Sequence, residues 1–321
     1  MADSLPTPRD SPQVVEPRAA ASAAVHADHL AQGIRFLALS KYAQASESLS
    51  YAVEALTELN GEIAMDNVEA LILYGKALLA NAIEQSAVLG GQAPTTSGPG
   101  PTDHTTPATS TSTATDANAN AGPSNAAFSF SGDADDDDDD EGENERDGEG
   151  EDGGPDDDFE QAFVVLDMAR RTIELELERL EREIADHKED QDATAARADL
   201  DKVTVTRKET LAEVHRLLGD VATESEQFEN AVEEYSAGLS ILTQTRPPSD
   251  RILSEQHMML ALALEFLPDQ TPRAVSHAEK AKSVLVVRLR ELEAKDTAAI
   301  TERERKEVQD LKELIVDVEN K

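Results

Sequence analysis

The feature that most constrains the fold of this chain is a pair of small residues twelve positions apart inside helical patterns. Gly33 precedes Ala45, and Gly219 precedes Ala231, by the same interval. Apolar residues recur around each pair at intervals of three and four, so each segment predicts two helices with one apolar face apiece. Because matched small residues let two helices pack closely, the pattern predicts repeated helical hairpins.

The tetratricopeptide repeat (TPR) is a hairpin of about 34 residues that fits this spacing. Its small residues stand at positions 8 and 20, and larger residues such as the one at position 24 fill the space around them. With Gly33 at position 8, Leu49 falls at position 24; with Gly219 at position 8, Tyr235 does. We expect each position-8 glycine to meet the position-20 alanine and so allow a close approach.

A further hairpin is divided by a long polar segment. Its first helix places Gly75 at position 8, whereas positions 16 to 20 appear only at residues 158–162, and Leu166 then takes position 24. A weaker fourth hairpin has Ala261 at position 8 and an inter-helix loop one residue too long. The chain is therefore predicted to be all-α, a TPR solenoid of about four hairpins with a disordered acidic insertion inside the second.

The periodicity and the helix breakers predict where the parts of the chain begin and end. Residues 186–206 are mostly charged and include the β-branched run Val203–Thr206, so we expect a break there and a helix from residue 207. The predicted parts are a disordered lead (1–24), the first hairpin with the first helix of the second (25–90), the insertion (91–158), the remaining hairpins (159–295) and a C-terminal capping helix (296–321).

The insertion is the most acidic part of the chain. Seventeen of the 26 residues from Asp133 to Asp158 are Asp or Glu, and Arg146 is the single base among them. Such a composition predicts a disordered segment. The ordinary role of such a segment is only to keep the chain solvated, and the alternative is that it captures a basic partner. Its densest stretch, which we predict to contact such a partner, is Asp135, Asp136, Asp137, Asp138, Asp139, Asp140 and Glu141.

Charge and composition narrow the classes of partner. The net charge of -37 at pH 7 repels nucleic acid and acidic lipid, so we expect no direct contact with either and favour basic proteins. The chain has no Cys, which fits a reducing compartment, and no apolar run approaches the roughly 20 residues of a membrane span. Its His residues lack metal-ligand spacing and no catalytic grouping stands out, so we expect a non-enzyme without metal or cofactor. A structural scaffold or an unrecognised hydrolase remains an alternative.

Three sequence segments resemble the SHNi-TPR family of histone chaperones. They are residues 74–79 before the insertion, residues 166–169 after it, and repeat three from Leu218 through Glu224–Glu226 to Tyr235. The resemblance covers roughly residues 26–90 and 159–290. It implies binding of histones H3 and H4, chiefly H3, with linker histone as a further candidate. It also implies a nuclear location, with cytoplasmic escort toward nucleosome assembly.

Two departures limit this transfer. The charged connection between Glu178 and Arg207 is longer than the family pattern, and residues 302–306 mix charge signs where relatives tend to have a basic import tail. If the chain is complete, import depends on its cargo.

Acidic residues are predicted to line the groove of the solenoid, where the first helix of each hairpin exposes positions 2, 5, 9, 12 and 13. Asp220 and Glu224 are four apart and therefore lie on one helix face, although a solvated acidic face is the ordinary alternative. Carboxylates there can accept charge-assisted hydrogen bonds from Arg. The resemblance implies that five of the predicted residues, Asp220, Glu224, Glu226, Glu255 and Met258, receive the C-terminal segment of H3. The full predicted histone-binding set is Glu213, Asp220, Glu224, Glu226, Glu255, Met258 and Glu265.

The main alternative is a TPR adaptor or co-chaperone that binds a peptide tail of another protein. The clamp that holds a tail carboxylate needs Lys or Asn at positions 5, 9 and 12, where the first repeat has Leu30, Ile34 and Leu37. The long helix after Phe159 or the segment 297–319 could pair with a second copy as a coiled coil, so a homodimer stays open. Whether H3 alone or an H3/H4 dimer is held also stays open.

Overall fold

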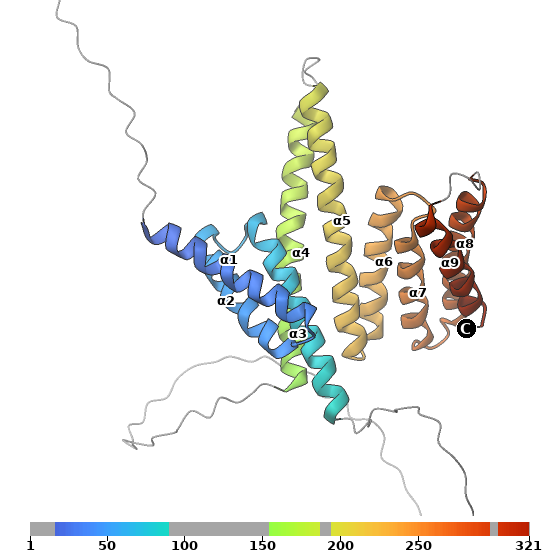
Figure 1. Ribbon diagram of the computed structural model, residues 1–321, viewed down its shortest axis with the longest axis horizontal. Coiled ribbons are helices and arrows are strands. Elements are labelled where there is room, and N and C mark those ends of the chain that lie inside the picture. The colour runs from blue at the N-terminus through green and yellow to red at the C-terminus, as the bar shows by residue number, and fades with distance from the viewer. Residues whose placement is uncertain (1–16, 90–153, 187–193, 296–300, 321) are drawn as a thin grey trace, which may run out of the picture. The chain divides into compact units, whose positions relative to one another are not determined.

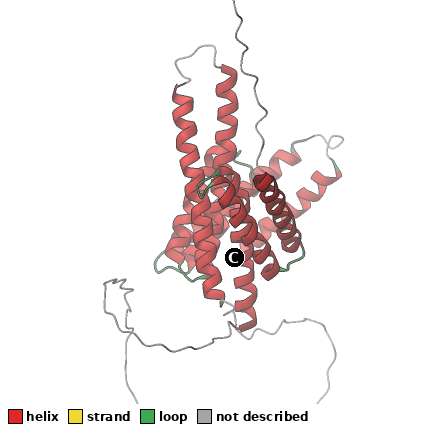
Figure 2. Ribbon diagram, turned by 90° about the vertical axis from the view of Figure 1, so that its left-hand side faces the viewer, coloured by secondary structure: helices red, strands yellow, loops and turns green. Residues whose placement is uncertain are grey.

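The structure of the chain is a computed structural model that describes residues 17–89, 154–186, 194–295 and 301–320. Within these ranges the chain forms nine α-helices, one short 3-10 helix and no strand (Figure 1). Figure 2 shows the same helices from the side. The predicted all-α class is confirmed. The acidic residues Asp135–Glu141 lie outside the described residues, and the proposed disorder of the insertion stays a prediction.

The helices pack as successive pairs. Helices α1 (Pro17–Ala38) and α2 (Tyr42–Asn60) form the first hairpin, and the 3-10 helix η1 (Met65–Asn67) leads into the second. Each hairpin also packs on the next, α2 on α3, α4 on α5 and α6 on α7, which is the arrangement of a TPR solenoid. The remaining pairs are α3 (Val68–Leu89) with α4 (Pro155–Asp186), α5 (Thr194–Glu224) with α6 (Phe228–Thr245), and α7 (Arg251–Glu265) with α8 (Thr271–Glu293).

The last helix covers the end of the stack, as predicted. Helix α9 (Glu302–Asn320) packs on α8, where Leu285, Leu292 and Leu311 are buried together. Among the described helices, none combines the length and the apolar character that crossing a membrane requires.

The position-8 glycines set the distance between the helices of a hairpin. A Cβ atom built on Gly33 would lie 2.5 Å from Leu49 Cγ, and one on Gly75 would lie 2.6 Å from Leu166 Cγ. The corresponding atom on Gly219 would overlap the Tyr235 ring. The nearest side chain is therefore the one at position 24, which corrects the expectation that the position-20 alanine fills this role. The alanine at position 20 is nevertheless buried in all three repeats.

Tight turns close the first and third hairpins in the same way. Ser40 and Glu226, both at position 15, have positive φ angles of 53° and 58°. In each turn the next residue donates its backbone N–H back to the helix, Lys41 to the Phe36 carbonyl (2.9 Å) and Gln227 to the Ala222 carbonyl (2.7 Å). Such bonds satisfy carbonyls that a helix end otherwise leaves unpaired. In the fourth hairpin Asp269 has the positive φ, one position later, as the predicted longer loop requires.

The second hairpin is closed by side chains. Asn81 near the end of α3 donates to the Asp158 carboxylate in the first turn of α4 (2.6 Å), and Gln85 donates to the same oxygen (3.3 Å). Helix α4 begins at Pro155, so residues 155–158 are helical and do not belong to the predicted disordered insertion. Asp156, Asp157 and Asp158 occupy the first turn, where negative charge is favourable beside the unpaired N–H groups of a helix start.

Two helices begin earlier than predicted. Helix α1 starts at Pro17, inside the segment predicted as a disordered lead, because an alanine-rich run follows a proline suited to the first helical position. Helix α5 starts at Thr194 and runs through Val203–Thr206, so the break predicted for residues 186–206 is wrong from residue 194 onward. Packing of α5 against α4 overrides the weak helix preference of these residues, and Thr204 is buried.

Candidate protein-binding site

The predicted groove residues of α5 form one stripe. Glu213, Asp220 and Glu224 are spaced seven and four residues apart, close to whole helical turns, so they share a face with Arg216. These four residues are called the groove stripe below. Glu213 accepts a hydrogen bond from Lys76 Nζ at 2.5 Å, which joins α5 to α3. The stripe therefore faces the side shared by the first helices of two neighbouring hairpins, as the TPR numbering predicts.

The Asp220 side chain is held by hydrogen bonds within the fold. Its carboxylate accepts hydrogen bonds from Arg216 Nη1 (2.5 Å) and from the Tyr235 hydroxyl (2.9 Å), and only 20% of its side chain is exposed. Burial raises the pKa of the Asp220 carboxyl, while the Arg216 charge and the two hydrogen bonds act in the opposite direction. Burial and the Asp220 charge in turn raise the pKa of Tyr235. A partner arginine would have to displace Arg216 to reach this carboxylate.

The other predicted residues are more accessible. Glu224 and Glu226 are exposed at the end of α5, and among the described residues neither side chain has a hydrogen-bond or ion-pair partner. Glu255, on α7, pairs with Arg251 Nε (3.3 Å) although both side chains are more than half exposed. Met258 is half-buried and Glu265 is exposed, both on α7. The structure thus brings Glu224 and Glu226 together and places the repeat-four residues on another helix.

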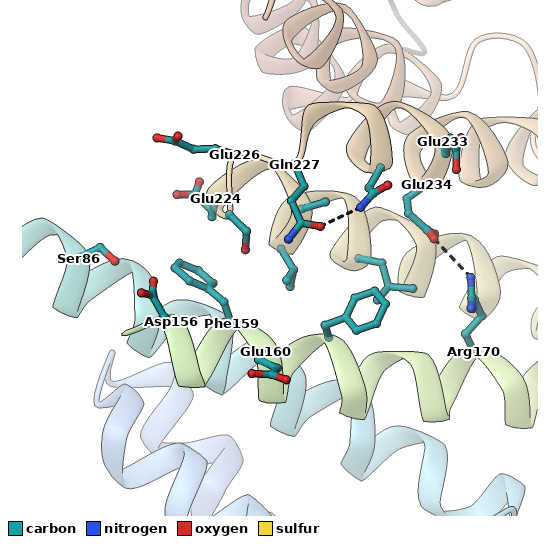
Figure 3. A pocket seen from close by; sticks show the side chains of 16 residues that line it. Ser86, Asp156, Phe159, Glu160, Arg170, Glu224, Glu226, Gln227, Glu233 and Glu234 are labelled. Atoms are coloured by element: carbon teal, nitrogen blue, oxygen red, sulfur yellow. Dashed lines mark hydrogen bonds and ion pairs between the residues drawn. The ribbon is translucent and has the colours of Figure 1, made fainter. Parts of the chain in front are cut away.

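Glu224 and Glu226 also line a cavity of about 1010 Å³ that the sequence did not predict (Figure 3). It is called the α4–α6 cavity below, because its walls come from the first half of α4 and the first turns of α6, with the end of α5 as its base and Ser86 of α3 at its rim. Phe159 and Phe163, four residues apart directly after the acidic run, were its only sequence signal. The lining residues used below are Asp156, Phe159, Glu160, Phe163, Glu224, Glu226 and Glu233.

An ion-pair network links α4 to α6 at one end of the cavity (Figure 3). Arg170 on α4 bonds to Asp167 and to Glu234 on α6, the latter at 3.3 Å. The second oxygen of Glu234 lies 2.7 Å from Nδ1 of His215, which is buried on α5. This network holds the second helices of repeats two and three at a fixed separation.

A second pair of histidines joins the helices of repeat four. Nδ1 of His257 on α7 lies 3.0 Å from Nδ1 of His277 on α8. Burial, then the neighbouring His277 and Lys280, lower the pKa of His257 to about 4. Burial also lowers the pKa of His277, with Lys280 and Arg273 adding to the effect. At neutral pH both rings are therefore uncharged, so one can donate to the other.

Comparison with known proteins finds one family model and several sequence relatives. Residues 212–249, which cover most of the second half of α5, all of α6 and the loop that follows it, match the SHNi-TPR family model, so the resemblance drawn from the sequence is confirmed there. The chain is 36% identical over 97 residues to nuclear autoantigenic sperm protein of Oryctolagus cuniculus, covering 28% of this chain and 14% of that protein. It is 32% identical over 124 residues to the NASP-related protein sim3 of Schizosaccharomyces pombe, covering 35% and 31%.

Two further proteins are similar to this chain. The histone-binding protein N1/N2 of Xenopus laevis is 35% identical over 78 residues, covering 24% of this chain and 13% of that protein. A solved structure of the yeast histone chaperone Hif1, described as a scaffold that recruits protein complexes to core histones, aligns with a TM-score of 0.46 and 14% identity, over 94% of this chain and 98% of that chain. The chain spans less than a third of the length of these curated relatives.

Proposed function

We propose that this SHNi-TPR chain is a histone chaperone that binds H3 and H4, chiefly H3, and escorts them from the cytoplasm to nucleosome assembly in the nucleus. The observation that carries the proposal is that the family match and the groove stripe lie on the same helix. The family match begins at residue 212, and the acidic groove stripe begins at Glu213 on the same helix. The name of one sequence relative, the histone-binding protein N1/N2, supports a histone as the basic partner.

Binding would use the carboxylates that the fold leaves accessible. Glu224, Glu226 and Glu265 have no partner among the described side chains, and the Glu255 pair with Arg251 is exposed enough to exchange. Each can accept charge-assisted hydrogen bonds from histone Arg, worth about 1.5 to 3 kcal/mol where water is partly excluded. Met258 would supply an apolar contact beside them. Glu213 and Asp220 would contribute mainly to the negative electrostatic potential of the groove, since each already forms an ion pair with a Lys or Arg side chain.

The acidic insertion would add attraction of longer reach. Its attachment points are the end of α3 and the start of α4, so its charge is tethered to the second hairpin. We infer that Asp135–Glu141 shield basic histone surface that would otherwise contact DNA. This attraction should weaken with salt, because the Debye length is only about 8 Å at physiological ionic strength.

A charge-reversal comparison tests the groove. The full chain with Glu224, Glu255 and Glu265 all changed to Lys is compared with a control in which Glu174, Glu178 and Glu181 of α4 are changed to Lys. Both sets are exposed and both alter the net charge equally. Fluorescence titration with H3/H4 at 150 mM salt should show a loss of affinity of about 100-fold for the groove variant and much less for the control. Equal losses would reject a localised groove and leave only general attraction between opposite net charges.

A deletion tests the insertion separately. Removing residues 133–152 keeps the helical first turn of α4 intact. The deletion should weaken H3/H4 binding more at 50 mM than at 300 mM salt and leave the melting temperature unchanged. Equal affinity at 50 mM salt would contradict a role for the insertion. A titration with a peptide ending in Glu-Glu-Val-Asp addresses the adaptor alternative, which requires that this acidic peptide bind.

A further inference from the structure

We infer that the α4–α6 cavity binds a short basic peptide segment that carries an aliphatic or aromatic anchor residue, at a site that shares only Glu224 with the groove stripe. The inference goes beyond the proposed function, since the cavity shares only Glu224 and Glu226 with the proposed histone-binding residues and the inference holds whether or not the groove takes a histone. It follows from where the cavity lies on α5, from its apolar base and from the state of its carboxylates.

The cavity and the groove lie on different sides of α5. Successive residues of a helix are rotated by about 100°, so Leu218, Val221 and Ala222 point away from the face that carries Glu213 and Asp220. The groove face contacts α3 through Lys76, whereas the cavity face lies toward α4 and α6, which Arg170 and Glu234 bridge. A segment held in the cavity would therefore not occupy the groove. Glu224, at the end of α5, is the only groove-stripe residue that also lines the cavity.

The base of the cavity is apolar and partly uncovered. Leu218 and Val221 are buried beneath it, and Phe159 is 8% exposed. Phe163 also lines the cavity and is 47% exposed. A half-exposed phenylalanine above buried leucine and valine is a surface that an aliphatic or aromatic side chain of a partner can cover favourably. This feature selects an anchor residue and disfavours a purely hydrophilic ligand.

The rim of the cavity is acidic and not neutralised. Asp156, Glu160, Glu224, Glu226 and Glu233 line it, and within the part of the chain that the structure describes none of these side chains has a hydrogen-bond or ion-pair partner. Arg170 is the only Lys or Arg among the lining residues, and Asp167 and Glu234 already neutralise it. Carboxylates beside an apolar base interact more strongly with cations than carboxylates in open water do.

The dimensions and the charge together favour a peptide. The volume of about 1010 Å³ is at the upper end of small-molecule sites, and the acidic residues are distributed over the ends of three helices. One small cation or metal ion could not reach them all, whereas a Lys or Arg on either side of an anchor residue could. Within the described residues no group of three or more His, Asp or Glu is placed to hold a metal ion. A segment of the pattern basic–apolar–basic matches both the rim and the base.

Fluorescence anisotropy on the full chain tests this assignment. The probe is a fluorescein-labelled peptide Gly-Lys-Arg-Leu-Lys-Arg-Leu-Lys-Gly, and the matched probe has each Leu replaced by Ser, so both carry the same charge. At 150 mM salt the wild-type chain should bind the Leu peptide about tenfold more tightly than the Ser peptide. The acidic insertion, present in every variant, attracts both peptides alike and cannot create that preference. Equal affinity for the two peptides would overturn the inference.

Variants locate the site. Phe163→Ser should abolish the preference for the Leu peptide, and the double variant Glu160→Gln with Glu233→Gln should weaken both peptides about tenfold. All three side chains are exposed, so the melting temperature should stay near that of the wild type. The double variant Glu174→Gln with Glu181→Gln on α4 is the charge-matched control and should bind as the wild type does. If Phe163→Ser keeps the preference, or the control loses as much affinity as the rim variant, the cavity is not the site.

The outcome is separable from that of the proposed function. Titration of the same variants with H3/H4 reports on the groove, which contains none of Phe163, Glu160 or Glu233. Loss of peptide discrimination together with normal dependence of H3/H4 binding on Glu255 and Glu265 supports two sites. If charge reversal at Glu255 and Glu265 leaves H3/H4 binding unchanged while the chain still prefers the Leu peptide, the proposed function is refuted and the cavity inference stands.

Discussion

Repeats two and three use the same packing inside the hairpin but close it in different ways. In both, a position-8 glycine accepts the side chain at position 24, Leu166 against Gly75 and Tyr235 against Gly219. Repeat three then turns within a few residues through the positive φ of Glu226, whereas repeat two leaves 64 residues, 90–153, between its described helices. The hairpin is therefore specified by its packed faces and not by its turn. This is why a polar insertion can replace the turn without dividing the solenoid.

The hydrogen bonds that close the two hairpins also differ. Repeat three satisfies the end of α5 through its backbone, with Gln227 N–H bonded to the Ala222 carbonyl. In repeat two the described closure is made by side chains, with Asn81 and Gln85 both donating to Asp158 across the base of the insertion. One hairpin depends on a backbone conformation and the other on side-chain identity, so mutations should distinguish them.

The largest effect should come from filling the shared contact. Gly219→Ala and Gly75→Ala each place a methyl group against the position-24 side chain, and we expect a net loss of about 2 kcal/mol after the better helix preference of Ala is included. Gly219→Ala should cost more, because the Tyr235 ring is also fixed by its hydrogen bond to Asp220 and cannot move aside freely. Urea denaturation followed by circular dichroism measures both. Unchanged urea midpoints for the two variants would show that the contact between position 8 and position 24 does not specify the hairpins.

The closure of repeat two should be the next most sensitive point. Asp158→Ala removes the acceptor of two amide donors, one of them on the 8%-exposed Asn81, and we expect a loss of about 1 to 2 kcal/mol. Gln227→Ala changes the same repeat position in repeat three, where the side chain only accepts a bond from Asn230 on the surface. Its effect should stay within about 0.5 kcal/mol. Similar losses in the two variants would show that both hairpins rely on side chains.

Shortening the insertion should stabilise repeat two. If residues 90–153 behave as a flexible chain, as their composition predicts, replacing them with about 20 residues of Gly and Ser lowers the entropy of closing the loop and raises stability by about 1 kcal/mol. Thermal melting of the shortened chain provides the measurement. A lower melting temperature would mean that the insertion contributes contacts of its own, which the comparison with repeat three does not include.

Repeat four adds a prediction about how the stability of the chain depends on pH. Its helices are joined by the His257–His277 contact, and the pKa of His257 lies at about 4 in the folded chain, below the ordinary value near 6.5 that the unfolded chain should show. Between pH 6.5 and about 4 the unfolded chain therefore binds a proton that the native ring excludes. Native stability is complete above pH 6.5 and falls as the pH falls toward 4.

After allowance for screening of a half-exposed ring, we expect this loss to be below about 1 kcal/mol. Melting curves at pH 7 and pH 4.5 should show it as a difference between the wild type and His257→Gln, which has no group to titrate at this position. His257→Gln should lose part of the pH dependence. Identical pH dependence in the wild type and in His257→Gln would contradict the shifted pKa.

The repeat pattern was predictable because it depends on short-range spacing. Gly33, Gly75 and Gly219 could be aligned from sequence alone, and the structure confirms the hairpins around them. The start of α5 could not be predicted, because the β-branched run Val203–Thr206 disfavours a helix locally and only its packing on α4 compensates. Helical periodicity placed Glu213 and Asp220 on one face, as observed. It could not show that Lys76, 137 residues away, holds Glu213, or that α4, α5 and α6 form a cavity with an apolar base and an acidic rim.

The residues lining the α4–α6 cavity include Ser86 and Asp156, which lie close to the two ends of the insertion. Ser86 is three residues before Leu89, the last described residue of α3, and Asp156 is two residues after Gly154. The acidic insertion is therefore attached at both ends beside the cavity. If the insertion attracts a cationic chain, as proposed above, that chain is held within a few nanometres of the apolar base, at an effective concentration that can reach the millimolar range. Binding to the insertion and binding in the cavity would then be consecutive steps on one molecule, so weak individual contacts would add up to a long residence time.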